Sequence, residues 1–149
     1  MFDAEIAKKL CRDRRYLANL GRVPAMDVIH TAIWVSDLDA TREYYIDALG
    51  LEHTWDFERD GVTNFYVGGS SETEIQFKYD PGRTEPIEPK GIDHLAVAVD
   101  DTDAMLEHMV EETGCEILGG PMEVAAANAY VAFIEDPDGY GVELVESLD

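Results

Sequence analysis

The sequence contains two copies of one unit, which lie 64 residues apart. The segment that begins at His30 aligns without gaps with the segment that begins at His94 over 23 residue pairs, nine of which are identical. The identical pairs are His30/His94, Ala32/Ala96, Val35/Val99, Asp37/Asp101, Asp39/Asp103, Ala40/Ala104, Glu43/Glu107, Gly50/Gly114 and Glu52/Glu116. A repeat of this length indicates two copies of one supersecondary structure, so the chain is expected to fold as a pair of similar modules.

Each copy predicts the same order of elements, a strand followed by a helix and three further strands. Asp37 and Asp101 stand where a helix begins, because such side chains accept hydrogen bonds from free backbone N–H groups, and Gly50 and Gly114 stand where a helix ends. The modules are expected at 28–80 and 92–147. The predicted helices are 38–49 and 102–113, and the predicted strands are 28–35, 52–57, 62–68, 73–79, 92–99, 115–118, 128–135 and 140–146.

Strand alternation places four polar side chains on the face that points away from the helices. In the first strand of each copy the apolar residues share one face, and His30 or His94 lies on the other. In the last strand of each copy Gln76 and Glu143 each lie between two apolar residues, so they project with the histidines. If the two copies meet about a pseudo-twofold axis, these four side chains converge in one concavity.

Two imidazoles, a carboxylate and an amide oxygen suit a divalent metal ion that keeps open positions for water or substrate. One such residue on a strand is more often an ordinary solvated or hydrogen-bonded side chain. Four of them at repeat-equivalent positions favour a site. His53 and His108 have no repeat mate of ligand type, and we interpret them as surface or packing residues.

The charge balance excludes some partners. The chain has 32 Asp and Glu against 11 Lys and Arg, a formal net charge of −21, which argues against binding to nucleic acid or to an anionic membrane surface. Because 46% of the residues are hydrophobic, an acidic surface over an ordinary core is the better description. Such a surface is typical of halophilic proteins. With only Cys11 and Cys115 and no disulfide framework, we expect a cytoplasmic protein.

Residues 1–25 form a separate, mildly basic segment with a local net charge of +3, so the remaining 124 residues carry −24. Apolar residues recur at helical spacing from Asp3 to Leu20, and Gly21 and Pro24 end the pattern. The segment is expected to be one amphipathic helix. It is either a docking arm or a dispensable extension of a domain that spans 26–149.

The segment from Ala132 to Leu144, AFIEDPDGYGVEL, resembles the turn and the last metal-binding strand of the vicinal oxygen chelate superfamily, and within it those of the glyoxalase I family. The segments 26–30 and 91–96 resemble the strands that carry the first and third ligands of that family. The resemblance covers 26–149 and implies an α+β fold, in which two βαβββ modules form a curved mixed sheet with the helices on its outer face. It implies one divalent metal ion, nickel or cobalt before zinc or manganese, held by His30, Gln76, His94 and Glu143.

The resemblance also implies a lyase that acts on a small molecule. In this family the hemithioacetal of methylglyoxal and a thiol binds the metal through its two neighbouring oxygens, and a carboxylate moves a proton from C1 to C2. We expect Glu143 to act as this base and the product to be a lactoyl thioester. Modules of the superfamily commonly pair across subunits, so a homodimer is expected. Whether each site forms within one chain or between two stays open.

The predicted substrate pocket departs from that of the short bacterial-type members of the family. Trp34 stands where they carry an arginine for a glutathione carboxylate, and Asp80 stands where they carry an asparagine. Gln76 takes the place of a glutamate and cannot accept a proton, which predicts a single base that acts on one face of the substrate. A thiol other than glutathione, or another substrate, is compatible with this pocket.

Three alternatives remain open. An enzyme like methylmalonyl-CoA epimerase would use Glu58 as a second acid or base beside Glu143. An enzyme like the extradiol dioxygenases would bind Fe(II) with two His and one Glu, which leaves Gln76 over. A non-catalytic drug-binding resistance module would lack metal ligands, so the four-residue set speaks against it.

Overall fold

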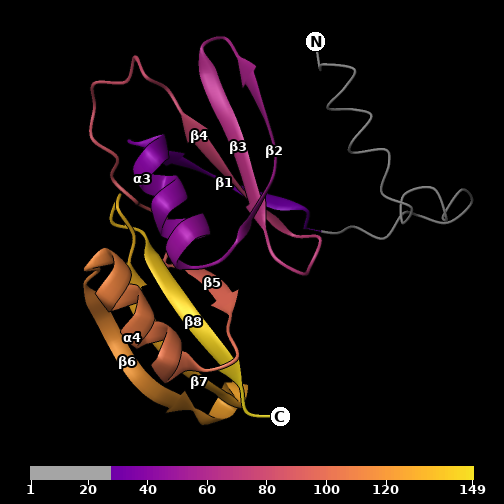
Figure 1. Cartoon of the computed structure of the whole chain (residues 1–149), viewed down its shortest axis with the longest axis vertical. Coiled ribbons are helices and arrows are strands. Elements are labelled where there is room, and N and C mark those ends of the chain that lie inside the picture. The colour runs from indigo at the N-terminus through magenta and orange to yellow at the C-terminus, as the bar shows by residue number, and fades with distance from the viewer. Residues whose placement is uncertain (1–27) are drawn as a thin grey trace, which may run out of the picture.

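The computed structural model describes residues 28–149, so the predicted helix within 1–25 lies outside the described residues. Two four-stranded sheets follow one another along the chain, with strand orders β1-β4-β3-β2 and β5-β8-β7-β6. In each sheet the first strand of the module lies at one edge and pairs in parallel with the last strand of the module. The other strand pairs are antiparallel. The paired modules and mixed sheets confirm the predicted α+β fold (Figure 1).

The first module contains β1 (His30–Val35), α3 (Leu38–Arg42), η1 (Glu43–Ala48), β2 (Glu52–Arg59), β3 (Val62–Gly68) and β4 (Glu74–Tyr79). The second contains β5 (Leu95–Ala98), α4 (Thr102–Thr113), β6 (Ile117–Val124), η2 (Ala125–Ala127), β7 (Ala129–Glu135) and β8 (Gly141–Ser147). No helix among the described residues is long and apolar enough to span a membrane.

The helices begin as the repeat predicts but differ in their hydrogen bonding. Asp37 accepts a hydrogen bond from the backbone N–H of Ala40, and Asp101 accepts the equivalent one from Ala104. The second helix spans the predicted residues. The first changes at Glu43 into a π-helical segment, and this wider turn accompanies three buried residues, Tyr44, Tyr45 and Ala48. Hydrophobic periodicity predicts the length of a helix but does not distinguish an α-turn from a π-turn.

The strand prediction is wrong at two places. β5 begins at Leu95 and not at residue 92, so His94 lies just before the strand. β6 extends to Val124 and not to residue 118. The sequence Gly119-Gly120-Pro121 looks like the end of a strand. In the structure β6 instead continues through this sequence, with register shifts against β7. Gly120 has a φ of +79°, and a Cβ atom there would lie 2.7 Å from the backbone oxygen of Val131, so the close approach of the two strands requires a glycine.

The apolar face of each sheet packs under its own helix, and the two buried faces join into one core. Figure 1 shows α3 in front of the first sheet and α4 in front of the second. Fully buried side chains on this face come from both modules, among them Val35, Phe77, Val142 and Leu144. The polar faces of the sheets, with the predicted ligands, therefore lie on the other side.

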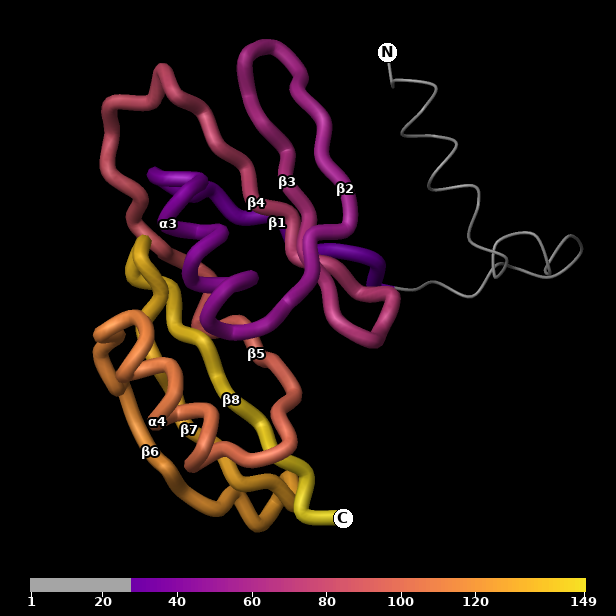
Figure 2. The backbone as a smooth tube through the Cα atoms, viewed as in Figure 1, coloured from indigo at the N-terminus to yellow at the C-terminus, as the bar shows by residue number. Residues whose placement is uncertain are grey.

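The turn between β7 and β8 joins the second module to the first (Figure 2). The hydroxyl of Tyr45 donates a 2.7 Å hydrogen bond to Asp136, and the hydroxyl of Tyr140 donates a 2.9 Å bond to the backbone oxygen of Trp34. Burial raises the pKa of Asp136, and burial beside this carboxyl raises the pKa of Tyr45. The turn that leads into β8, the strand of the predicted ligand Glu143, thus also forms a contact between the two modules.

Candidate metal centre

His30 and Gln76 share one face of the first sheet. Across β1 and β4, the register pairs Ala32 with Gln76 and Trp34 with Lys78, so the side chains of His30, Trp34, Gln76 and Lys78 project to the same side. The ring of His30 lies edge-on to that of Tyr66, with 5.5 Å between centroids. Gln76 is buried at the centre of this face, between β1 and β3.

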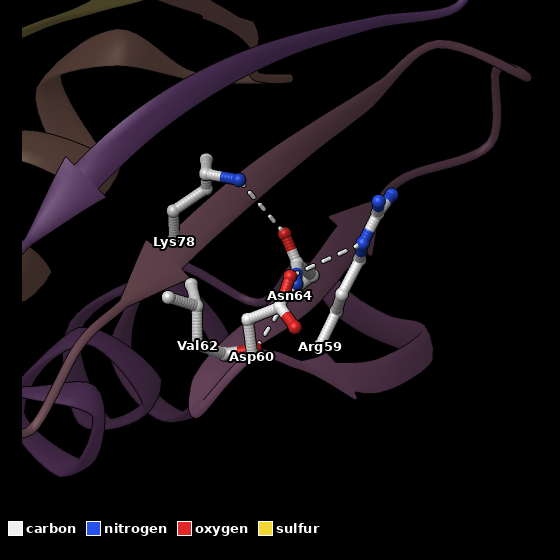
Figure 3. Close-up of polar contacts among 5 residues, drawn as sticks. All are labelled: Arg59, Asp60, Val62, Asn64 and Lys78. Atoms are coloured by element: carbon white, nitrogen blue, oxygen red, sulfur yellow. Dashed lines mark hydrogen bonds and ion pairs between the residues drawn. The ribbon is translucent and has the colours of Figure 1, made fainter. Parts of the chain in front are cut away.

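A short chain of hydrogen bonds orients the Gln76 amide. Figure 3 shows the part of this chain that Lys78, Asn64 and Val62 form. The Nζ of Lys78 lies 3.1 Å from Asn64, and because an ammonium group can only donate, the Asn64 atom that faces it is the oxygen Oδ1. The same oxygen lies 2.8 Å from Gln76, which must therefore turn its Nε2 donor towards Asn64. The Asn64 amide nitrogen donates to the backbone oxygen of Val62 at 3.2 Å. This arrangement leaves Oε1 of Gln76, the amide atom that is able to bind a metal, without a hydrogen bond within the described residues.

His94, just before β5, and Glu143, on β8, lie together at the edge pair of the second sheet. The Nε2 atom of His94 is 3.2 Å from Oε2 of Glu143, and the other ring nitrogen, Nδ1, is 2.7 Å from the carboxylate of Asp93. Glu143 pairs with Ala96 on β5 and with Phe133 on β7, and the Phe133 ring packs edge-on to His94 at 5.5 Å. Both ligand candidates are held by their neighbours.

This donor set fits a divalent metal ion. When the Nδ1–H group of a neutral His94 donates a hydrogen bond to Asp93, Nε2 and the Glu143 carboxylate present lone pairs to each other. Only a cation or a proton between them relieves the repulsion. A carboxylate that holds the far nitrogen of a histidine is the usual partner of a metal-binding imidazole. In the other module, the amide oxygen of Gln76 is a neutral donor that a divalent ion also accepts.

One chain does not bring the two halves of this set together. Within residues 28–149, no three His, Cys, Asp or Glu side chains lie close enough to hold one metal ion. The expected convergence in a single concavity therefore does not occur within the chain. The physical reason is that the modules meet through η1, α4 and the turn between β7 and β8, which leaves the two polar sheet faces unopposed.

The three residues predicted for the substrate pocket lie in different places. Trp34 lies beside Lys78 on the Gln76 face. Asp80 stabilises the turn after β4, where it accepts a 2.8 Å hydrogen bond from the N–H of Gly82. Glu58 pairs with Thr63, and Thr63 pairs with Tyr79, so Glu58 projects to the helix side of the sheet and away from Gln76. It cannot serve as a second base on this face.

The two other histidines have structural contacts. His108 lies 2.8 Å from the backbone oxygen of Ala48 and so links the helices of the two modules. His53 stacks on Phe65 on the helix side of the first sheet and lies 2.9 Å from Asp56.

Sequence reasoning missed Asn64, Lys78, Asp93 and Tyr66. Lys78 was two residues from Gln76 on the same strand, so alternation alone places it on the same face. Asp93 adjoins His94 in the sequence. The positions of Asn64 and Tyr66 depend on the register of β3 against β4, which no local pattern predicts.

Aromatic rings cover the rest of the first sheet's polar face. Trp55 stacks on Tyr66 with 4.2 Å between centroids and on Phe57 at 5.3 Å. Burial raises the pKa of Tyr66 to about 12, so its hydroxyl stays protonated at neutral pH. This face can therefore receive an apolar or planar part of a ligand next to Gln76.

A cavity of about 530 Å³ lies elsewhere, at the junction of the modules, and contains none of the four predicted ligands. Most of its polar lining is acidic: Glu43, Asp47, Glu112, Glu116, Glu135 and Asp136. The cavity is therefore unsuited to a reaction at His94 and Glu143.

Comparison with known proteins agrees with this geometry. The model of the glyoxalase/bleomycin resistance protein/dioxygenase superfamily matches residues 27–144. A lactoylglutathione lyase from Haemophilus influenzae is 32% identical over 127 residues, which are 82% of this chain and 93% of that protein.

Solved structures show the same fold. Glyoxalase I from Zea mays superposes with a TM-score of 0.71 at 28% identity over 82% of this chain, which spans 45% of the maize protein. TnmS3, an antibiotic-binding protein from a Streptomyces species, superposes with a TM-score of 0.67 at 22% identity, over 85% of this chain and 99% of that protein. This second likeness concerns the fold alone.

Proposed function

Because this chain belongs to the glyoxalase/bleomycin resistance protein/dioxygenase superfamily, we propose that it is a metal-dependent lyase of the glyoxalase I type. Its substrate is the hemithioacetal of methylglyoxal and a small thiol, and its product is a lactoyl thioester. The observation that carries the proposal is the pairing of His94 with both Asp93 and Glu143, an arrangement suited to a metal-binding histidine beside a carboxylate base. The relatives named lactoylglutathione lyase support the same reaction.

His30, Gln76, His94 and Glu143 would hold one divalent ion, nickel or cobalt before zinc or manganese. When bound, the metal supplies Lewis acidity, which polarises the two neighbouring oxygens of the substrate. Asp93 holds the ring of His94 through Nδ1, and Asn64 holds the amide of Gln76 through Nε2. The protein thus orients two of the four ligands through hydrogen bonds to a second residue.

Glu143 is the proposed base. It accepts the proton from C1 of the hemithioacetal and returns it to C2, so the reaction is an isomerisation with no net gain or loss of atoms. Gln76 cannot take part in proton transfer because an amide has no basic oxygen of suitable pKa. We therefore propose that the enzyme uses one of the two hemithioacetal diastereomers.

The active protein is proposed to be a homodimer whose sites form between subunits. In one chain the His30 and Gln76 half is separate from the His94 and Glu143 half, and a second copy supplies the missing half to each. The wide polar faces of both sheets, which remain unopposed in one chain, support this arrangement.

A subunit-mixing experiment tests the dimer. His30→Ala and His94→Ala are each expected to be inactive, because each homodimer has two damaged sites. After the two variants are unfolded and refolded together, a mixed dimer has one site with both histidines intact, and about a quarter of the wild-type activity returns. Activity that stays at the level of the separate variants would contradict shared sites.

The reaction itself is tested by thioester formation from methylglyoxal with a panel of thiols, together with metal analysis of the purified protein. Glu143→Gln is expected to keep the metal and to lose about 10²–10⁴-fold in kcat, the usual contribution of a general base. Unchanged turnover would exclude Glu143 as the base. The epimerase alternative requires a second acid or base beside the substrate. The position of Glu58 on the helix side of the sheet disfavours this alternative.

A further inference from the structure

Positive charge is rare in residues 28–149, and two of the few basic residues there lie against one aromatic ring. This part of the chain has five basic residues: Arg42, Arg59, Lys78, Arg83 and Lys90. Arg59 and Lys90 each pair with a carboxylate close in sequence, Asp60 at 3.5 Å and Glu88 at 2.6 Å (Figure 3 shows the first pair). Lys78 and Arg83 form no ion pair with any carboxylate among the described residues, although the chain is strongly acidic.

Lys78 and Arg83 both lie against the ring of Trp34. The Nζ of Lys78 is 5.2 Å from the ring centroid, and the guanidinium carbon of Arg83 is 5.3 Å from it. Each cation has one further contact, Lys78 with Asn64 and Arg83 with the backbone oxygen of Glu85 at 3.4 Å. Most of their hydrogen-bond donors have no protein acceptor within the described residues.

Three features of the fold hold this group in place. The sheet register sets Trp34 directly opposite Lys78 on neighbouring strands. The turn at 80–83, closed by a 3.1 Å hydrogen bond from the N–H of Arg83 to the oxygen of Asp80, brings Arg83 back over the strand end. Tyr140, from the second module, fixes the backbone of Trp34. Two cations held within about 5 Å of the centre of one ring, with no carboxylate of the described residues paired to either, favour the binding of an anion nearby.

We propose that Lys78, Arg83 and Trp34 form an anion-binding subsite, which takes a carboxylate or phosphate carried by the non-reacting part of the substrate. Lys78 follows Gln76 by two residues on the same face, so an anion bound there is next to the proposed metal ligand. The indole ring packs against the chain that joins the anion to the reacting carbon. This choice of substrate rests on the proposed function, whereas the binding of an anion does not.

The subsite explains how this chain can select an anionic substrate although Trp34 replaces the arginine of the short bacterial-type family members. A ring cannot pair with a carboxylate, but it can hold two flexible cations in place by cation–π contact. Arg83 offers a planar pair of donors and Lys78 a point charge, a combination suited to a carboxylate or phosphate. The expected thiol is therefore anionic, and a neutral thiol of the same shape is a poor substrate.

Matched pairs of thiols test this selection. One pair is 3-mercaptopropionate and its neutral amide, and the other is 4′-phosphopantetheine and pantetheine. The wild type is expected to prefer the anionic member of at least one pair by about tenfold or more in kcat/KM, and the pair with the larger ratio identifies carboxylate or phosphate. Equal values within both pairs would overturn the proposal.

Variants assign the preference to these residues. Arg83→Met is expected to lower kcat/KM for the anionic thiol about tenfold, as for one lost hydrogen bond to a charged group, and to leave the neutral thiol unchanged. Lys78→Met should do the same, with partial recovery in Lys78→Arg. Arg42→Met is the matched control, because Arg42 also stacks on a ring, Phe65 at 4.7 Å, but on the helix side of the sheet. A loss in Arg42→Met equal to that in Arg83→Met would show a general charge effect and overturn the assignment.

A binding measurement separates this proposal from the reaction. Titration calorimetry measures the binding of S-methylated 3-mercaptopropionate and of inorganic phosphate to the wild type and to Arg83→Met. This measurement needs no turnover. Tighter binding of either anion to the wild type, about tenfold and weakened by added KCl, supports the subsite even if no thioester forms with any thiol. Equal binding of both anions to both proteins overturns it even if the lyase reaction is found.

Discussion

Asn64 illustrates how much a single buried amide contributes to this site. It is 3% exposed, its oxygen accepts from both Lys78 and Gln76, and its nitrogen donates to the backbone. Because Lys78 can only donate, the whole chain of contacts has one allowed orientation. The orientation of the Gln76 amide is therefore set by Asn64, a side chain that is not itself a proposed metal ligand.

Asn64→Leu is expected to weaken metal binding about 10–100-fold, since it removes the group that orients Gln76. It should also lower the free energy of unfolding by about 1–3 kcal/mol, because buried donors of Gln76 and Lys78 lose their acceptor. Competition with a chromogenic chelator measures the first effect and urea unfolding the second. Asn64→Asp keeps an acceptor oxygen at the same place and should retain most of the affinity. Metal affinity in Asn64→Leu equal to the wild type would contradict the orienting role.

At the scale of elements, the strand pair β6 and β7 depends on one close approach. Gly120 combines a positive φ with a missing Cβ whose place lies 2.7 Å from a backbone oxygen. Backbone atoms on the opposing strand cannot move aside as the end of a flexible side chain can. The register shifts on either side of Gly119 show the same crowding.

Gly120→Ala should therefore destabilise the protein more than Gly61→Ala. Both glycines have a φ of +79°, but a Cβ at Gly61 meets no atom within 4 Å. Gly61→Ala reports the cost of the backbone conformation alone, about 1–2 kcal/mol. The difference between the two midpoints of urea unfolding isolates the contact. An equal loss of unfolding free energy in the two variants would show that β6 and β7 accommodate a Cβ at residue 120 without cost.

The turn between β7 and β8 is an element with two roles. It leads the chain into the strand of Glu143, and its side chains Asp136 and Tyr140 contact the first module. A motif that looks specific for metal binding is thus also a packing motif. The same short sequence therefore leads into the strand of Glu143, a proposed ligand, and holds the two modules together.

For the molecule as a whole, buried tyrosines predict sensitivity to alkali. Burial raises the pKa of Tyr44 and Tyr45 well above the ordinary value near 10. The folded state therefore keeps these protons at a pH where the unfolded chain has lost them. The stabilisation is fully present below about pH 10 and is lost as the pH rises beyond it, by about 1.4 kcal/mol per pH unit for each such group.

Urea unfolding between pH 9 and 11.5 measures this slope. Tyr45→Phe is less stable than the wild type at neutral pH because Asp136 loses a hydrogen bond, but its slope above pH 10 should be shallower by about one proton. A wild-type free energy of unfolding that stays constant up to pH 11.5 would contradict the prediction.

The acidic surface predicts a dependence on salt. A net charge of −21 on 149 residues repels itself in dilute buffer, and added ions screen that repulsion. The melting temperature is expected to rise from low salt to molar KCl. The double variant Glu111→Gln/Glu112→Gln, at two exposed positions of α4, should reduce the rise. Equal melting temperatures at low and high salt would exclude adaptation of this surface to high salt.

The sequence alone was enough for the architecture, because the repeat and the period of two along each strand are local properties. Alternation along the strands predicts that His30 and Gln76 lie on the face of the first sheet away from the helix, and that Glu143 lies on the equivalent face of the second. The N-caps Asp37 and Asp101 follow from the repeat. Each of these depends on neighbours a few residues away, which a sequence shows directly.

How the two modules meet, and what surrounds each predicted ligand, became known from the folded chain. The separation of the two halves, the outward position of Glu58 and the place of Arg83 over Trp34 depend on strand register, on a turn and on contacts between residues about a hundred positions apart. Such contacts are selected by the packing of the whole core and not by any local pattern. The sequence therefore predicts the residue types of the candidate site, whereas the contacts of those residues depend on the folded structure.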